Sequence, residues 1–178
     1  MFRWGSASTS RGRPQRIIWQ MEEGVMSDTN DQMNEQVEND HHALLDTLKQ
    51  LDSAFEEIPE RDDFTNWKLQ RLWQLRDFQN QLQKHFDLEE SGGYNEELRR
   101  MAPQLSSRIE HLEEDHLKIT SDLNHILDVL KLIQHVDSAK LERVKCRVEG
   151  LVSFIRRHES EENDVIQEAY YQDFGVGD

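Results

Sequence analysis

Two stretches of the sequence place a histidine four residues before a glutamate. His85 precedes Glu89 in KHFDLEESGGY, and His158 precedes Glu162 in RHESEEN. On an α-helix this spacing puts both side chains on one face, about one turn apart. Imidazole nitrogens and carboxylate oxygens are ligands for iron, manganese and zinc, so each pair can contribute two ligands to a metal site.

Each pair is preceded by a histidine that follows an acidic residue. His41 lies in NDHHALLDTL and His116 in EDHLKITSDL, and the two stretches resemble each other. His85 follows His41 by 44 residues, and His158 follows His116 by 42 residues. The chain therefore repeats one helix pair, and each half supplies two histidines and one glutamate. This internal symmetry suits two metal ions, because glutamate side chains are long enough to bridge them.

The composition between residues 28 and 172 is typical of long helices. Leu, Glu, Gln, Lys and Arg, all good helix formers, fill this range. Glycine and proline interrupt it only at Pro59, Gly92, Gly93, Pro103 and Gly150. We therefore expect an all-α fold, an up-down-up-down antiparallel four-helix bundle built from two helix-pair repeats with the metal site in its core. The expected helices lie at about 30–57, 64–90, 104–134 and 138–171, with a short helical turn near 95–101 and Asp137 or Ser138 capping the last helix.

Core positions recur at alternating spacings of three and four along each expected helix. Six of these positions carry ionisable residues where Leu or Ile would be expected: His41, His85, Glu89, His116, His158 and Glu162. An unpaired charge in a bundle core costs several kcal/mol, and a metal ion compensates for it. A single buried histidine is more often a hydrogen-bonded core residue, and a lone His-x-x-x-Glu is commonly a surface pair. Six such residues, at least one from each helix, favour a metal centre.

Other polar and aromatic residues fall outside this pattern. We expect solvent exposure for His111, His125 and His135. Solvent exposure or a hydrogen bond to a ligand is expected for Glu90 and Glu161. Simple packing is expected for Trp67, Trp73, Phe86 and Tyr170.

The charge and the cysteine content argue against several kinds of partner and site. The formal net charge is −15, whereas nucleic-acid binding requires clustered lysine and arginine. No apolar run approaches the ~18 residues that would span a membrane. Cys146 is the single cysteine, so an internal disulfide and a thiolate metal site are excluded. We expect a cytoplasmic protein that binds neither nucleic acid nor membranes, and the sequence indicates no particular protein partner.

The first residues differ from the rest of the chain. The stretch MFRWGSASTSRGRPQR contains Arg, Ser and Gly and no acidic residue. It has no apolar stretch of the ~7–15 residues that a secretory signal needs, although its Arg and Ser content resembles an organellar transit peptide. We expect residues 1–27 to be a disordered or non-native extension, residues 28–174 to form the bundle, and residues 175–178 to be a C-terminal tail.

With these motifs, the sequence resembles the hemerythrin-like HHE cation-binding family. The matching stretches are NDHHALL, HFDLEESGGY, EEDHLKI and HESEENDVI, and the resemblance covers about residues 30–172. It implies a non-haem di-iron centre inside a four-helix bundle, with two iron ions bridged by two carboxylates and a solvent oxygen. Manganese or zinc also suits these ligands. Members of the family bind oxygen, sense oxygen or iron, or handle reactive oxygen and nitrogen species.

The resemblance assigns the metal-ligand role motif by motif. His41 is preferred over His42 because it lies on the core face, with Leu44 and Leu45 three and four residues later. The full set of implied ligands is His41, His85, Glu89, His116, His158 and Glu162. A further ligand can come from Glu159, Tyr94 or solvent.

Two features depart from the oxygen-carrying members of the family. Those members have His-x-x-x-His on the third helix, but here Leu112 stands four residues before His116. They also end with His-x-x-x-x-Asp, whereas here Asn163 stands five residues after His158. Reversible oxygen carriage therefore does not transfer directly to this chain.

Three functions fit the ligand set. The first is a binding or sensor domain whose di-iron centre takes dioxygen or a related small ligand. The second is a di-iron enzyme acting on peroxide, nitric oxide or a small substrate, and the third is an iron buffer or structural metal site. Two Fe(II) ions, two glutamates and a bridging hydroxide leave a net charge of about +1, fewer anions than in a ferritin-like site. This charge favours the ferrous state, and with it the first function.

Overall fold

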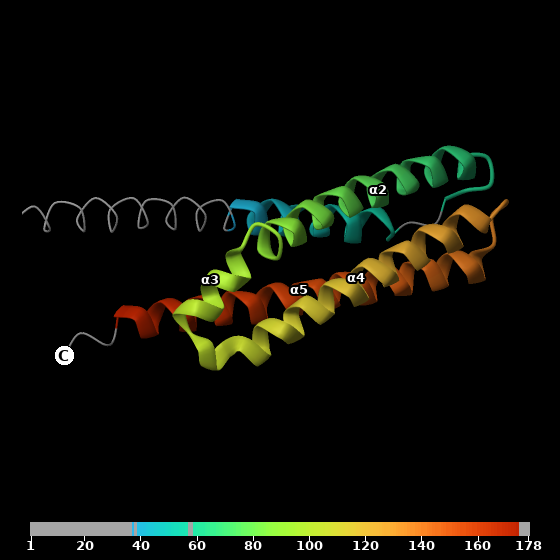
Figure 1. Cartoon of the computed structure of the whole chain (residues 1–178). Helices are drawn as coiled ribbons and strands as arrows, with labels where there is room; N and C mark the ends of the chain where they lie inside the picture. Colours follow the sequence, from blue (N-terminus) through green and yellow to red (C-terminus); the bar gives the residue numbers. More distant parts are fainter. Residues whose placement is uncertain (1–36, 38, 57–58, 175–178) are drawn as a thin grey trace, which may run out of the picture. The chain divides into compact units, whose positions relative to one another are not determined.

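The computed structural model describes residues 37, 39–56 and 59–174, of which residues 171–174 by their backbone alone. The regular structure of these residues is helical throughout (Figure 1). The first helix covers residues 39–54, and the later elements are α2 (Phe64–Glu89), α3 (Tyr94–Met101), the 3-10 turn η1 (Pro103–Leu105), α4 (Ser106–Leu132) and α5 (Ser138–Phe174). The prediction of an all-helical fold is confirmed for this part of the chain.

The observed helices agree with the expected ones to within a few residues where the structure describes both. The short turn expected near 95–101 is an eight-residue helix, α3. The expected start of the first helix near residue 30, the extension over residues 1–27 and the tail over residues 175–178 lie outside the described residues.

The first helix ends at residue 54, earlier than the expected residue 57. The N–H of Phe55 bonds to the carbonyl of Asp52 at 3.2 Å, and the N–H of Glu56 bonds to that of Ser53 at 3.3 Å. These bonds span three residues and tighten the chain into a turn. Pro59 follows closely, and a proline disfavours helical geometry in the residue before it.

The core faces predicted from the spacing of apolar residues are buried in the structure. Leu48, Phe78, Ile119 and Ile155, one from each long helix, are almost completely inaccessible to solvent and belong to one continuous apolar cluster. α4 packs along α5, and α2 packs along α4. The first helix is tied to α2 by a 2.8 Å hydrogen bond from Arg71 Nη1 to the backbone carbonyl of residue 54. The core positions that carry His and Glu are therefore held at fixed places between the helices.

The prediction that Trp73 packs against the rest of the protein was wrong, because its side chain is 74% exposed. It lies two positions before Leu75, which points into the core, and two residues correspond to about half a turn of helix. Trp67 does pack, with its ring 5.8 Å from that of Phe55 in an edge-on contact.

No helix in the described part of the chain is long and apolar enough to cross a membrane.

Two adjacent glycines turn the chain at the end of α2. Gly93 has φ +88°, a backbone conformation that other residues rarely adopt. A Cβ atom on Gly92 would clash with the backbone carbonyl oxygen of Leu88. Both positions therefore require glycine. Because of this tight turn, only four residues connect the end of α2 at Glu89 to the start of α3 at Tyr94.

The start of α5 gives a prediction about stability. Asp137 Oδ1 accepts a 3.1 Å hydrogen bond from the backbone N–H of Lys140, as an N-cap does. Asp137→Ala should lower the free energy of unfolding by about 1 kcal/mol, as measured by urea denaturation. Asp137→Asn, which keeps a capping oxygen, should stay close to the parent chain. Equal losses in the two variants would show that the cap is not responsible.

Candidate metal centre

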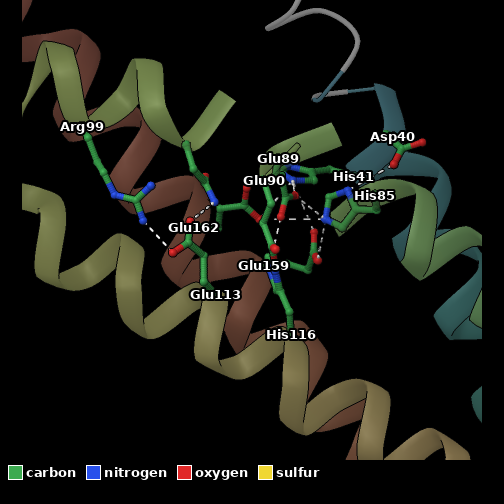
Figure 2. A network of polar contacts seen from close by, with 11 residues as sticks. Asp40, His41, His85, Glu89, Glu90, Arg99, Glu113, His116, Glu159 and Glu162 are labelled. Carbon is green, nitrogen blue, oxygen red and sulfur yellow. Dashed lines mark hydrogen bonds and ion pairs between the residues drawn. The ribbon is translucent and has the colours of Figure 1, made fainter. Parts of the chain in front are cut away.

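The four long helices bring their polar core residues together at one level. The first helix contributes His41, and α2 contributes His85 and Glu89 from its last turns (Figure 2). α4 contributes His116, and α5 contributes both His158 and Glu162. All six predicted residues therefore lie in one cluster. Five of them are buried, and His41 is half-buried with a side-chain exposure of 14%.

The histidines form two pairs with nearly identical geometry. The rings of His41 and His85 lie 4.9 Å apart at an angle of 68°. The rings of His116 and His158 also lie 4.9 Å apart, at an angle of 72°. The internal repeat of the sequence therefore appears in the structure as two equivalent pairs of imidazoles.

Glu89 lies between the two histidine pairs. Its Oε1 atom is 2.7 Å from Nε2 of His85 and 3.7 Å from Nε2 of His41. Its other oxygen, Oε2, is 3.1 Å from Nε2 of His116. One carboxylate therefore faces both pairs with different oxygen atoms, which is the arrangement of a bridging ligand.

Two carboxylates of α5 complete the cluster. Glu162 Oε2 is 3.2 Å from Nε2 of His41 and 4.0 Å from Nε2 of His85. Glu159 is buried as well, with its two oxygens 3.4 Å from His85 Nε2 and 3.7 Å from His41 Nε2. The sequence reasoning named Glu159 only as an optional extra ligand. Its position three residues before Glu162 places it near the same helix face, but at the edge of the predicted core positions.

The ligand atoms fall into three overlapping groups in which every atom lies within 4.8 Å of the others. The groups share members, since Glu89 belongs to two of them, as do His158 and Glu162. They are His41, His85, Glu89 and Glu162; Glu89, His116 and His158; and His158, Glu159 and Glu162. Glu89 and Glu162 therefore each lie within reach of two groups of ligand atoms.

Most of the polar atoms that face the interior of the cluster are left without directed hydrogen bonds. Twelve buried side-chain nitrogen and oxygen atoms of the described residues have no hydrogen-bond partner, and ten of these belong to the cluster. The 2.7 Å approach of His85 to Glu89 is an ion-pair distance, but its direction does not suit an N–H bond. Buried polar groups in proteins are normally satisfied. The unmet capacity of these seven residues fits a metal ion, whose ligands point at it rather than at one another.

Protons compensate the charges of the cluster when it holds no cation. Burial opposes the charging of His41, but the carboxylates of Glu162 and Glu89 outweigh it and raise the pKa of His41 to about 10. In the same way, Glu159 and Glu89 raise the pKa of His85 to about 11 against the effect of burial. A metal ion binds the neutral imidazole and must displace these protons, so acid weakens its binding.

The remaining groups differ in their charge. Burial, together with the charge of His116, lowers the pKa of His158 to about 4, so this imidazole is neutral near pH 7. Burial and the charge of Glu89 raise the pKa of Glu162 to about 7. Burial also acts to raise the pKa of Glu89, but the three surrounding histidines hold it well below its usual range. Glu89 is therefore anionic at neutral pH.

Two carboxylates outside the cluster accept hydrogen bonds from histidines of the cluster, at the ring nitrogen that faces away from it. Asp40 Oδ2 lies 3.1 Å from Nδ1 of His85, and Glu90 Oε1 lies 2.6 Å from Nδ1 of His116 (Figure 2). Each bond leaves Nε2 facing the cluster, and such partners commonly orient metal-bound histidines. The hydrogen bond from His116 to Glu90 is one of the alternatives expected from the sequence. The hydrogen bond from His85 to Asp40 was not predicted, although an acidic residue before the histidine is part of the repeated motif.

A second network joins α3 to α4 beside the centre. Glu113 of α4 accepts a 2.6 Å hydrogen bond from Arg99 Nη2 and a 3.2 Å hydrogen bond from Asn95 Nδ2 (Figure 2). Tyr94, the other optional ligand, is buried at the start of α3, and burial raises the pKa of its phenol. The phenol is therefore protonated at neutral pH.

The residues expected to lie off the centre do so. Four histidines that were not included in the ligand set have exposed side chains: His42, His111, His125 and His135. Phe86 is buried and stacks on the ring of His116 with 3.8 Å between the ring centres. The preference for His41 over His42 agrees with the direction of the two side chains.

Comparison with known proteins gives one match. The family model of the hemerythrin HHE cation binding domain matches residues 22–170, most of the chain. Searches of the curated proteins and of the solved structures found no significant match. The matched range contains both histidine pairs and all three buried carboxylates of the cluster. The chain therefore belongs to the hemerythrin HHE cation-binding domain family, and it is a metal-binding protein.

Proposed function

We propose that this protein holds a non-haem di-iron centre that binds or senses dioxygen or a related small ligand. One observation supports it above the others: two histidine pairs of equal geometry face opposite oxygens of a single glutamate, Glu89. We propose further that residues 28–174 form the domain, as a four-helix bundle with up-down-up-down topology. The four long helices and the short connection of residues 133–137 support that topology.

Each metal position would take one histidine pair. His41 and His85 would hold the first ion, and His116 and His158 the second. Glu89 and Glu162, each of which belongs to two of the ligand groups, would supply carboxylates to both positions, and Glu159 would add a third carboxylate. Iron held by these residues would supply a ferrous–ferric couple for reaction with dioxygen. Manganese and zinc suit the same nitrogen and oxygen donors, so metal analysis is part of the test.

Glu159 changes the charge balance that the sequence suggested. Two Fe(II) ions, three carboxylates and one hydroxide sum to a charge of about zero, instead of about +1 with two carboxylates. Each added anion stabilises the ferric state relative to the ferrous state. The centre therefore lies closer to ferritin-like sites than the six predicted ligands alone imply, and its charge no longer favours oxygen binding over oxygen chemistry.

A groove beside His116 favours an enzyme as the second candidate function. It has a volume of about 460 Å³ and lies between α2 and α4, with Phe86, Glu90 and His116 among its lining residues. Polar side chains from α4 complete its wall, including Thr120, Ser121 and Asn124. A small polar substrate such as peroxide could approach the second metal position from this side.

One experiment separates the candidate functions. The protein is loaded with Fe(II) without oxygen, exposed to air, and followed by visible absorption. An oxygen-dependent absorption that reverses when oxygen is removed supports binding or sensing. An irreversible change with repeated consumption of peroxide supports the enzyme. Iron that stays bound with no absorption change in air contradicts both and leaves the iron buffer or structural site.

The outer carboxylates give a prediction about affinity. Glu90→Ala and Asp40→Ala should each weaken iron binding by about 10–100-fold, because His116 and His85 lose the bonds that orient them. Competition with a chromogenic Fe(II) chelator measures the change. Glu90→Gln keeps an acceptor oxygen and should recover part of the loss. Asp46→Ala, at an exposed aspartate whose ion-pair partner is Lys49, serves as the matched control and should bind iron as the parent does.

The compartment is also a proposal. Cys146 is exposed and unpaired, as is common where thiols are kept reduced. We propose that the protein works in the cytoplasm, which fractionation of cells expressing the whole chain would test.

A further inference from the structure

A second hollow lies far from the metal centre, where α4 ends and α5 begins. Its volume is about 350 Å³, at the small end of the range of ligand pockets. α4 contributes Val129 and Leu132, and Ile133 follows directly after it. Thirteen residues of α4 separate Val129 from His116, which corresponds to about 20 Å along the helix. This hollow is therefore separate from the candidate centre.

The charged residues that line the hollow are all cationic. Lys140, Arg143 and Arg147 line it from the first three turns of α5, in a chain whose net charge is −15. Their spacings of three and four residues place them on one face of the helix. Lys140 pairs with Asp137 at 3.2 Å, but neither arginine forms an ion pair with a described residue. Two guanidinium groups are therefore available to the same anion.

The floor of the hollow is apolar. Val144 and Ile133 are buried beneath it, and Val129 is partly buried. Leu132 forms part of the rim and is 77% exposed, among the largest exposures of any large apolar side chain in the described residues. A bound apolar group would remove this leucine from water, which is favourable.

The end of α4 does not repel an anion as a helix C-terminus normally would. Lys68 Nζ donates to the backbone carbonyl of Ile133 at 2.7 Å and to that of Lys131 at 3.2 Å. These bonds offset the negative end of the helix. The N-terminus of α5 is already capped by the carboxylate of Asp137, so the attraction for an anion comes from the two arginines.

We infer that this hollow binds a small amphipathic oxyanion, a molecule with a carboxylate or phosphate group on a short apolar body. The anionic group lies between Arg143 and Arg147, which can hold it through paired N–H donors. The apolar body lies against Val129, Val144 and Leu132. Because the site shares no residue with the metal cluster, its binding is independent of the metal and of the proposed function.

Isothermal titration of the full-length, metal-loaded protein tests this inference with four probes. Octanoate and octyl phosphate carry both features, acetate lacks the apolar body, and octan-1-ol lacks the charge. We expect saturable binding of at least one of the two octyl anions, and at least tenfold weaker binding of acetate and octan-1-ol. The stronger of the two anions identifies the headgroup as carboxylate or phosphate.

Variants locate the binding to the hollow. The double variant Arg143→Gln, Arg147→Gln should weaken octyl-anion binding at least tenfold, and Leu132→Gln should weaken it severalfold. Both changes are at exposed positions, so circular dichroism and metal content should stay as in the parent. Arg156→Gln, at an exposed arginine further along α5, is the matched control and should bind as the parent does.

Several results would overturn the inference. Absence of saturable binding for both octyl anions would do so, as would equal binding by the parent and the double arginine variant. Self-association of the protein that the double variant abolishes, without anion binding, would assign the hollow to a second copy of the chain instead. Binding of octan-1-ol as strong as that of octanoate would show that the arginines have no role.

Discussion

Removing the metal should lower the melting temperature of this protein by about 10 °C or more. The buried cluster contains three carboxylates and four imidazoles whose facing atoms lack directed hydrogen bonds. Each unsatisfied buried group costs roughly 1–3 kcal/mol, and protonated histidines recover only part of this. A metal ion present at about a thousand times its dissociation constant stabilises the folded state by about 4 kcal/mol. The change is measured by differential scanning calorimetry after chelation under reducing conditions.

Adding the metal back provides the control for this result. Anaerobic Fe(II) should restore the melting temperature of the chelated protein, whereas Mg²⁺, which prefers oxygen ligands, should not. Replacing Glu89 and Glu162 together with Leu should remove the metal and yet partly restore the stability of the metal-free protein. The two leucines would fill buried positions beside apolar neighbours. A metal-free parent that melts at the temperature of the loaded protein would contradict the account.

Substitution of one histidine in either pair should strip iron from the protein. His85→Ala and His158→Ala each remove a proposed ligand that no neighbour would replace, because both side chains are buried at fixed positions on their helices. We expect at least a 100-fold loss of iron affinity in each variant, measured by chelator competition and by elemental analysis. His125→Ala, at an exposed histidine of α4, is the matched control and should keep the full iron content.

The two histidine variants also test the symmetry of the centre. If each pair holds one ion, both variants lose the bridged pair of ions, because Glu89 and Glu162 serve both positions. Retention of full iron by His158→Ala together with its loss in His125→Ala would show that the assignment of the core face of these helices is wrong.

The spacing of residues along each helix was sufficient to find most of the cluster. His85 and Glu89 interrupt an apolar series of α2, and the structure buries both where that series predicts. The repeat then identified His41 and His116 as the other members of the two pairs. Periodicity gives the direction of a side chain, so it works wherever the helix is regular.

Contacts between helices were harder to predict. Asp40 reaches His85 across 45 residues of sequence, and this contact depends on how far the first helix is rotated and shifted against α2. Glu159 lies one residue from His158, at the edge of the predicted core face, and only the packing of α5 decides that it points inward. Trp73 looked like a core residue because of its type, although its position on α2 points it outward.

The metal content of the purified full-length chain tests the central claim most directly. The protein is expressed in iron-replete medium, purified under reducing conditions, and analysed for iron, manganese and zinc per chain. Two histidine pairs that share Glu89 predict about two metal ions per chain, mainly iron. One ion per chain, or none, would contradict the account of a bridged pair of metals held by these seven residues.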